Sequence, residues 1–246
     1  MPAAEKAKKL FEEGKVREAI TEVMAYLRDH PSDTKQRTFL FELLCFSGDF
    51  DRAEKQLGVL AQGDQSTELG AVLYYSVLNA EKLRHQTVSK QEFSNPTPST
   101  ALSGSLNGRT FGSLRDADPD LGARLEVFAA GACLWIPFEH IESLEIQPPR
   151  KLRDTLWATA MLRTGPAFKG MELGEVIIPV IYPFSWKHPN EAVWLGRLTD
   201  WAADEKGVAY PSGQRILQVD NEEIPFLEIR SLEFHHPAGV AQATAN

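Results

Sequence analysis

The spacing of apolar residues changes near residue 100, and the change predicts two kinds of structure. Over residues 1–93, apolar side chains recur every three or four positions, as in amphipathic helices. Over residues 109–236 they form short runs and alternations bounded by glycine and proline, which is typical of β-strands. Residues 94–108, rich in Asn, Pro, Thr, Ser and Gly, predict a linker. We therefore expect an α+β chain with a helical domain, a linker, a β-rich and barrel-like domain, and a tail over residues 237–246.

The longest apolar run, residues 174–183, predicts the central strand of the second domain. Its β-branched residues suit a pleated strand better than a helix, and its length fits a strand that is buried on both faces. Pro179 cannot donate a hydrogen bond to a neighbouring strand, so it predicts a bulge or an unpaired edge.

A 34-residue period runs through the helical part, which is the period of tetratricopeptide repeats. Each glycine of the period can end a helix in the left-handed conformation, and each alanine allows two helices to approach closely. Pro31 closes the first repeat, and Asp33 is a candidate N-cap for the next helix. The paired positions are Leu10 and Leu44, Gly14 and Gly48, Val16 and Phe50, and Ala19 and Ala53.

A fifth helix is predicted over residues 67–90, and it departs from the repeat because Lys82 stands where a third glycine would be. We expect it to be a capping helix that shields the last repeat. Its predicted apolar side consists of Leu69, Val72, Leu73, Val77 and Leu78.

Repeats of this kind stack with a concave face that commonly binds peptides. By the usual repeat geometry, Thr38, Glu42, Cys45 and Phe46 would face that groove. The alternative is that two repeats are too few for a groove and that this face docks on the second domain. The sequence leaves both possibilities open.

In the second domain we predict strands over residues 123–130, 133–136, 144–147, 154–162, 215–219 and 226–234. Residues 139–143 predict a helical turn, and residues 220–223 a hairpin turn. Residues 190–201 fit either a helix or a strand.

Charge and cysteine content restrict the possible partners. The formal net charge is −8, with a balance of −1 over residues 1–90 and −7 over residues 91–246, so no basic stripe is available for nucleic acid or an anionic membrane. The N-terminus lacks the apolar core of a signal peptide, and no stretch is long enough to cross a bilayer. Two isolated cysteines, Cys45 and Cys133, predict reduced thiols in a cytoplasmic protein.

The sequence contains no complete catalytic or cofactor motif, so we predict no cofactor and no metal. Counting from Asp116 as an EF-hand loop puts Leu121 and Val127 where glycine and glutamate are needed, which rejects calcium. His235 and His236 are adjacent and would point in different directions on a strand.

The second domain also contains tryptophans and neighbouring Arg and Asp residues, which fit either an interaction surface or a packed core. If they form an interaction surface, the candidate partner-binding residues also include Trp135, Arg153, Trp157, Arg197, Asp200 and Trp201. A rival hypothesis is an enzyme site in which Arg153, Asp154, Arg197 and Asp200 converge. A third is a generic repeat adaptor.

Seven segments, in order along nearly the whole chain, resemble motifs of the ImpE/TagJ (SciE-type) family. They are residues 116–122, 135–138, 152–157, 174–183, 195–201, 213–215 and 227–234. One departure is Phe184, where the family pattern leads us to expect glycine, and it puts the local turn in question.

The resemblance implies an accessory protein of the bacterial type VI secretion system, cytoplasmic and without catalysis. It further implies binding to the N-terminal helical segment of the small contractile-sheath subunit, with a role in sheath assembly or disassembly. No catalytic residue is implied.

Overall fold

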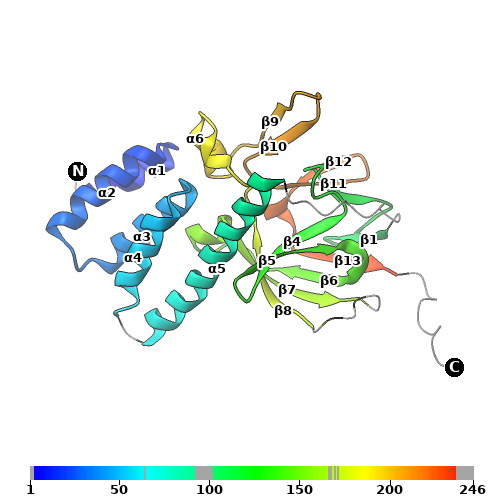
Figure 1. Cartoon of the computed structure of the whole chain (residues 1–246), viewed down its shortest axis with the longest axis horizontal. Coiled ribbons are helices and arrows are strands. Elements are labelled where there is room, and N and C mark those ends of the chain that lie inside the picture. Colours follow the sequence, from blue (N-terminus) through cyan, green and yellow to red (C-terminus); the bar gives the residue numbers. More distant parts are fainter. Residues whose placement is uncertain are drawn as a thin grey trace.

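The computed structural model describes residues 3–63, 65–91, 102–165, 168, 170 and 172–236. Helices form one side of the molecule and strands the other, with the longest helix between them (Figure 1). The described helices of the first part are α1 (Ala3–Glu12), α2 (Val16–Asp29), α3 (Thr34–Phe46), α4 (Phe50–Leu60) and α5 (Gln65–Lys90). No helix in these ranges is long and apolar enough to span a membrane.

The second part is built from antiparallel strands, which confirms an α+β chain. Short helical segments connect them: η1 (Phe138–His140), η2 (Leu152–Thr155), η3 (Ser185–Lys187), α6 (Glu191–Trp194) and η4 (Phe226–Glu228). The strands are β1 (Ser103–Leu106), β2 (Arg109–Phe111), β3 (Leu114–Asp116), β4 (Arg124–Ala129), β5 (Ala132–Pro137), β6 (Ile141–Ile146), β7 (Trp157–Thr164), β8 (Gly174–Pro179), β9 (Asp200–Ala203), β10 (Ala209–Ser212), β11 (Ile216–Val219), β12 (Glu222–Pro225) and β13 (Ser231–His235).

Eight strands form one sheet in the order β2-β1-β13-β6-β7-β8-β4-β5. A three-stranded sheet, β12-β11-β3, and the hairpin β9–β10 complete the β-rich part. β2 and β5, the two edge strands of this sheet, do not pair with each other in the described residues. The sheet predicted to be barrel-like is therefore open and does not close into a barrel.

The two glycines of the 34-residue period end their helices in the same way, as predicted. Gly14 and Gly48 have φ angles of +79° and +72°. In each turn the N–H of the following residue, Lys15 or Asp49, donates to a carbonyl five residues earlier, which is the Schellman pattern. The Asp33 side chain accepts a hydrogen bond from the Gln36 N–H, so the predicted N-cap is also confirmed.

The predicted apolar side of α5 is correct for two of its five residues. Val77 and Leu78 are buried, but Leu69, Val72 and Leu73 are 66%, 61% and 47% exposed. The β4–β5 turn reaches α5 at Asn79, whose Nδ2 donates to the Gly131 carbonyl at 2.9 Å. The first half of α5 extends beyond that contact, which leaves Leu69, Val72 and Leu73 uncovered.

The strand predicted over residues 174–183 is present as β8, an inner strand between β7 and β4, but it ends at Pro179, four residues earlier than predicted. Other segments differ from their predictions. Residues 152–155 form η2 before β7 begins, residues 226–228 form η4 before β13, and residues 190–201 contain the one-turn helix α6 followed by the start of β9. β1 begins at residue 103, inside the predicted linker, while residues 92–101 and 237–246 lie outside the described residues.

Candidate functional site

An apolar groove of about 820 Å³ lies between the helices and the β-rich part. Its walls come from α1, from α3 and from residues 151–153 of the segment that contains η2. No strand residue is among its lining residues. They are Ala4, Glu5, Lys8, Phe11, Lys35, Gln36, Thr38, Phe39, Glu42, Lys151, Leu152 and Arg153.

The floor of the groove is aromatic and aliphatic. Phe11 of α1 and Phe39 of α3 meet edge to face, with ring centroids 5.7 Å apart, and Leu152 adds an aliphatic wall. The Arg197 guanidinium lies 4.8 Å from the Phe11 ring centroid and donates to the Glu12 carbonyl at 2.8 Å. Phe11, Phe39 and Leu152 are partly buried, and Arg197 packs on the Phe11 ring. The floor is therefore a packed apolar surface that can receive an apolar side chain.

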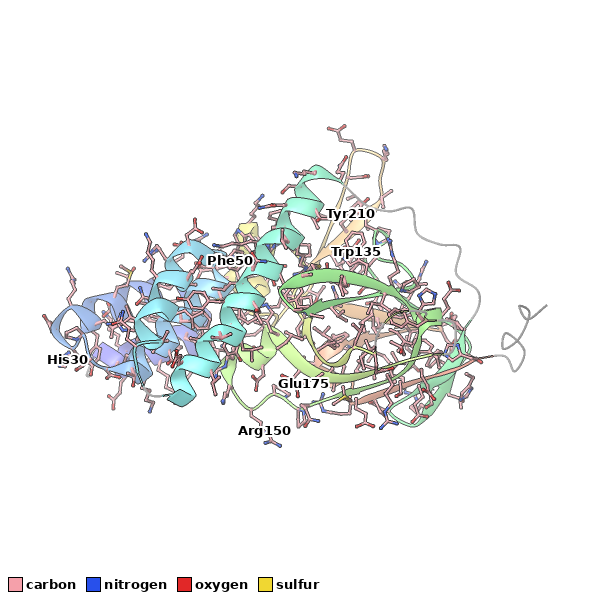
Figure 2. All side chains as sticks on the ribbon, turned by 60° about the horizontal axis from the view of Figure 1, so that its bottom comes forward. His30, Phe50, Trp135, Arg150, Glu175 and Tyr210 are labelled. Atoms are coloured by element: carbon pink, nitrogen blue, oxygen red, sulfur yellow. The ribbon has the colours of Figure 1, made fainter. Side chains whose placement is uncertain are left out.

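The rim of the groove is basic, although the chain as a whole is acidic. Lys8, Lys35 and Lys151 are exposed around it, and Glu5 is the exposed carboxylate among its lining residues. Arg150, next to Lys151 in the sequence, also projects outward at this junction (Figure 2). This rim therefore favours a ligand that carries negative charge.

An ion pair joins the two parts of the molecule at the end of the groove. Arg153 Nη1 lies 3.1 Å from Glu42 Oε1, and the guanidinium lies 4.9 Å from the Tyr74 ring centroid. Burial raises the pKa of Glu42, and Arg153 opposes that effect. Asp154, whose carboxylate accepts hydrogen bonds from two backbone N–H groups, holds η2 in place beside this pair.

Of the four residues predicted to face a concave groove, two line this one. Thr38 and Glu42 do so, whereas Cys45 and Phe46 are 2% exposed and pack under the β-rich part. One face of α3 therefore passes from an open groove at Thr38 and Glu42 to a contact covered by the β-rich part at Cys45 and Phe46. The residues around that contact include Leu156, Ile181, Trp186 and Trp194.

The predicted tryptophan surface is divided between core and solvent. Trp157 is buried, and its Nε1 donates to Glu81 Oε2 at 2.9 Å. Trp135 donates to Glu126 Oε1 at 2.9 Å and lies well away from Arg150 (Figure 2). Trp201 is 38% exposed on the hairpin β9–β10.

The four residues of the enzyme hypothesis are engaged in separate interactions. Arg153 pairs with Glu42, Asp154 caps η2, Arg197 bonds to the Glu12 carbonyl, and Asp200 Oδ2 lies 3.1 Å from His188 Nε2. Within the described ranges, no three His, Cys, Asp or Glu side chains are placed to hold a metal ion.

Sequence reasoning missed a buried ionic network between α5 and the sheet. Arg84 and Arg215 both pair with Glu126, whose side chain is 1% exposed, and Arg215 also pairs with Asp116 at 3.3 Å. Burial raises the pKa of Glu126, but the two arginines outweigh it and lower that pKa to about 2. Burial raises the pKa of Asp116 to about 7 against the opposing effect of Arg215. The side chains of this network are at most 2% exposed, and they join α5 to the β-rich part.

Two lining residues of α3, Lys35 and Phe39, were also missed, although a signal for them existed. They recur at helical spacing with the predicted Thr38 and Glu42 on one face of α3, so extending the predicted face toward the helix N-terminus would have found them. No pattern in the sequence around Leu152 indicates that this residue of the β-rich part lines the groove.

Phe184, the departure from the family pattern, has a φ angle of +62°. This left-handed conformation is the one that glycine adopts without strain, which explains why glycine is expected there. Its ring packs 4.7 Å from that of His85.

Comparison with known proteins shows similarity to a protein family, to a secretion-system component and to a solved structure. The model of the ImpE protein family matches residues 108–233. The type VI secretion system accessory component TagJ of Pseudomonas aeruginosa PAO1 is 27% identical over 265 aligned positions, covering 93% of this chain and 90% of that protein. The crystal structure of protein VPA1032 from Vibrio parahaemolyticus is similar with a TM-score of 0.83 at 22% identity, covering 95% of this chain and 98% of that one, which shows a shared fold.

Proposed function

Because the chain belongs to the ImpE protein family, we propose that it is an accessory component of a bacterial type VI secretion system. In this proposal it is a non-catalytic cytoplasmic protein that binds the N-terminal helix of the small contractile-sheath subunit and assists sheath assembly or disassembly. The similarity to TagJ supports the secretion role, and the groove between helices and sheet supports the binding role.

The observation that carries this proposal is the groove with its Phe11–Phe39–Leu152 floor. A helical ligand buries an apolar stripe and satisfies its own backbone hydrogen bonds, so it needs an apolar trough rather than a free strand edge. The lining residues from α1 and α3 provide such a trough. Thr38, Glu42 and Arg153, all candidate partner-binding residues, lie along it.

The helical part also supports binding in this groove. Two Schellman turns with the same geometry, 34 residues apart, favour tetratricopeptide-like repeats over residues 1–93, with the β-rich domain over residues 109–236. In such repeats the first helix of each hairpin faces the ligand, and these helices are α1 and α3.

A second candidate face is the hairpin β9–β10 with the residues just before it, where Leu198, Trp201 and Val208 are 45%, 38% and 38% exposed. Exposed tryptophan is common at binding hot spots, so the same sheath helix could be held there instead. The experiment below separates the two faces.

The test is calorimetric titration of a peptide from the N-terminus of the small sheath subunit into the full-length protein. We expect saturable binding that Phe39→Ala weakens at least about tenfold, because a central aromatic anchor is lost. Trp201→Ala is the matched control and should leave affinity unchanged. Loss of binding in Trp201→Ala alone would move the site to the hairpin, and no binding to the unmodified protein would overturn the proposed function.

A further inference from the structure

The charged residues that line the groove indicate which kind of ligand it favours. Four cationic residues and two carboxylates line it, and one pair of these, Arg153 and Glu42, is already matched at 3.1 Å. Three lysines and the single carboxylate of Glu5 remain on the rim. A local excess of positive charge of this kind, on a chain whose net charge is −8, marks a site with a specific electrostatic preference.

Two of the three lysines are not held in an ion pair by another residue of the described ranges. In the part of the chain that the structure describes, Lys35 and Lys151 take part in no ion pair within 4.0 Å. Lys8 has only a 3.7 Å contact with Glu12 at the exposed surface. These ammonium groups are therefore available to carboxylates of a bound molecule.

The positions of the lysines relate them to the apolar floor. Lys8 is three residues before Phe11 on α1, and Lys35 is four residues before Phe39 on α3, so each cation lies one helical turn from an aromatic floor residue. Lys151 precedes Leu152 on the opposite wall. A ligand that buries apolar side chains on the floor would place its flanking side chains next to these ammonium groups.

We infer that the ligand of this groove is an amphipathic helix whose apolar stripe is flanked by carboxylates. This deepens the proposed function and rests on its assignment of the groove as the binding site. Carboxylates on both flanks would pair with lysines on both walls, while the apolar stripe would contact Phe11, Phe39 and Leu152. A helix with basic flanks would meet Lys8, Lys35 and Lys151 as like charges and be disfavoured.

The ion pairs at this rim would be exposed to solvent, and this exposure limits how strongly the groove prefers an acidic helix over a basic one. Exposed pairs are individually weak, so three of them together favour an acidic over a basic helix by about tenfold at low salt. Because salt screens such pairs, the preference should shrink as ionic strength rises, whereas the apolar contribution should persist.

The test uses two synthetic helical peptides with identical leucine stripes, one flanked by glutamates and the other by lysines. Fluorescence anisotropy with the full-length protein is expected to show the acidic peptide binding about tenfold more tightly at roughly 50 mM salt. The double variant Lys35→Glu/Lys151→Glu should abolish or invert this preference. Lys55→Glu, an exposed charge reversal on α4, is the matched control and should preserve it.

Equal or tighter binding of the basic peptide, no binding of either peptide, or an acidic preference that survives the double variant would each overturn the inference. A third peptide, from the small sheath subunit, separates this inference from the proposed function. If the acidic peptide binds in the groove and the sheath peptide does not bind, the inference stands and the sheath assignment fails. If the sheath peptide binds and Lys35→Glu/Lys151→Glu leaves its affinity unchanged, the inference fails and the sheath assignment stands.

Discussion

The substitution Gly48→Ala tests how tightly the helices dock on the β-rich part. Gly48 ends α3 with a φ angle of +72°, and a Cβ at this position would overlap the indole ring of Trp186 in η3. That ring is held on three sides, with ring centroids 4.5 Å from His85, 5.4 Å from Phe50 and 5.5 Å from Phe184. The indole therefore has little freedom to move away.

Two costs add in this variant. A side chain in the left-handed conformation costs about 1–2 kcal/mol. Forcing an extra methyl group into a well-packed contact costs about a further 1–3 kcal/mol. We therefore expect Gly48→Ala to lower the free energy of unfolding by about 2–5 kcal/mol, a large part of the stability of an ordinary domain.

Gly14→Ala provides a matched control. Gly14 ends α1 with nearly the same φ angle, +79°, but the nearest atom to an added Cβ is Arg197 Nη1 at 3.9 Å, an ordinary contact. Only the backbone cost of about 1–2 kcal/mol applies there. Urea unfolding followed by tryptophan fluorescence measures both variants.

The difference in the free energy of unfolding between the two variants isolates the contact between Gly48 and Trp186. Gly48→Ala should be less stable than Gly14→Ala by about 1–3 kcal/mol. Equal destabilisation within about 0.5 kcal/mol would show that Trp186 does not pack against the α3–α4 turn, and would refute the docking described here.

Three further predictions concern the buried polar groups. Glu126→Gln should lower the free energy of unfolding by about 3 kcal/mol, measured by urea unfolding, because Arg84 and Arg215 lose their shared counter-charge. Burial lowers the pKa of His85 to about 4, so the unfolded chain takes up a proton first as pH falls below about 6.5. Acidification from pH 7 to 5 should therefore lower the free energy of unfolding, measured by urea unfolding, by about 2 kcal/mol more in the natural protein than in the variant His85→Gln. Burial raises the pKa of both cysteine thiols, so Ellman's reagent should react with them only after unfolding.

Local features of this fold could be predicted because a few neighbouring residues determine them. The Schellman turns at Gly14 and Gly48, the N-cap at Asp33 and the apolar strand that became β8 all follow from short stretches of sequence. The strands β1 to β3 could not be recognised because Ser103–Leu106 alternates weakly and pairs with β13, more than 120 residues away.

The groove could be predicted only in part, because tertiary contacts decide where it ends. Thr38 and Cys45 lie on the same helix, yet the first lines the groove and the second is covered by the β-rich part. Leu69 and Leu78 show the same limit on α5, where amphipathic spacing continues past the end of the sheet contact. Periodicity identifies a face that can be buried, but the position of the partner element determines how much of it is.

Site-specific photocrosslinking in bacteria that express the sheath tests whether the groove binds the small sheath subunit. A benzophenone amino acid at Thr38 would lie in the groove, and the same amino acid at Trp201 would lie on the exposed hairpin β9–β10. We expect a covalent adduct with the small sheath subunit from position 38 and none from position 201. An adduct from position 201 alone, or none from either position while the sheath is assembled, would contradict it.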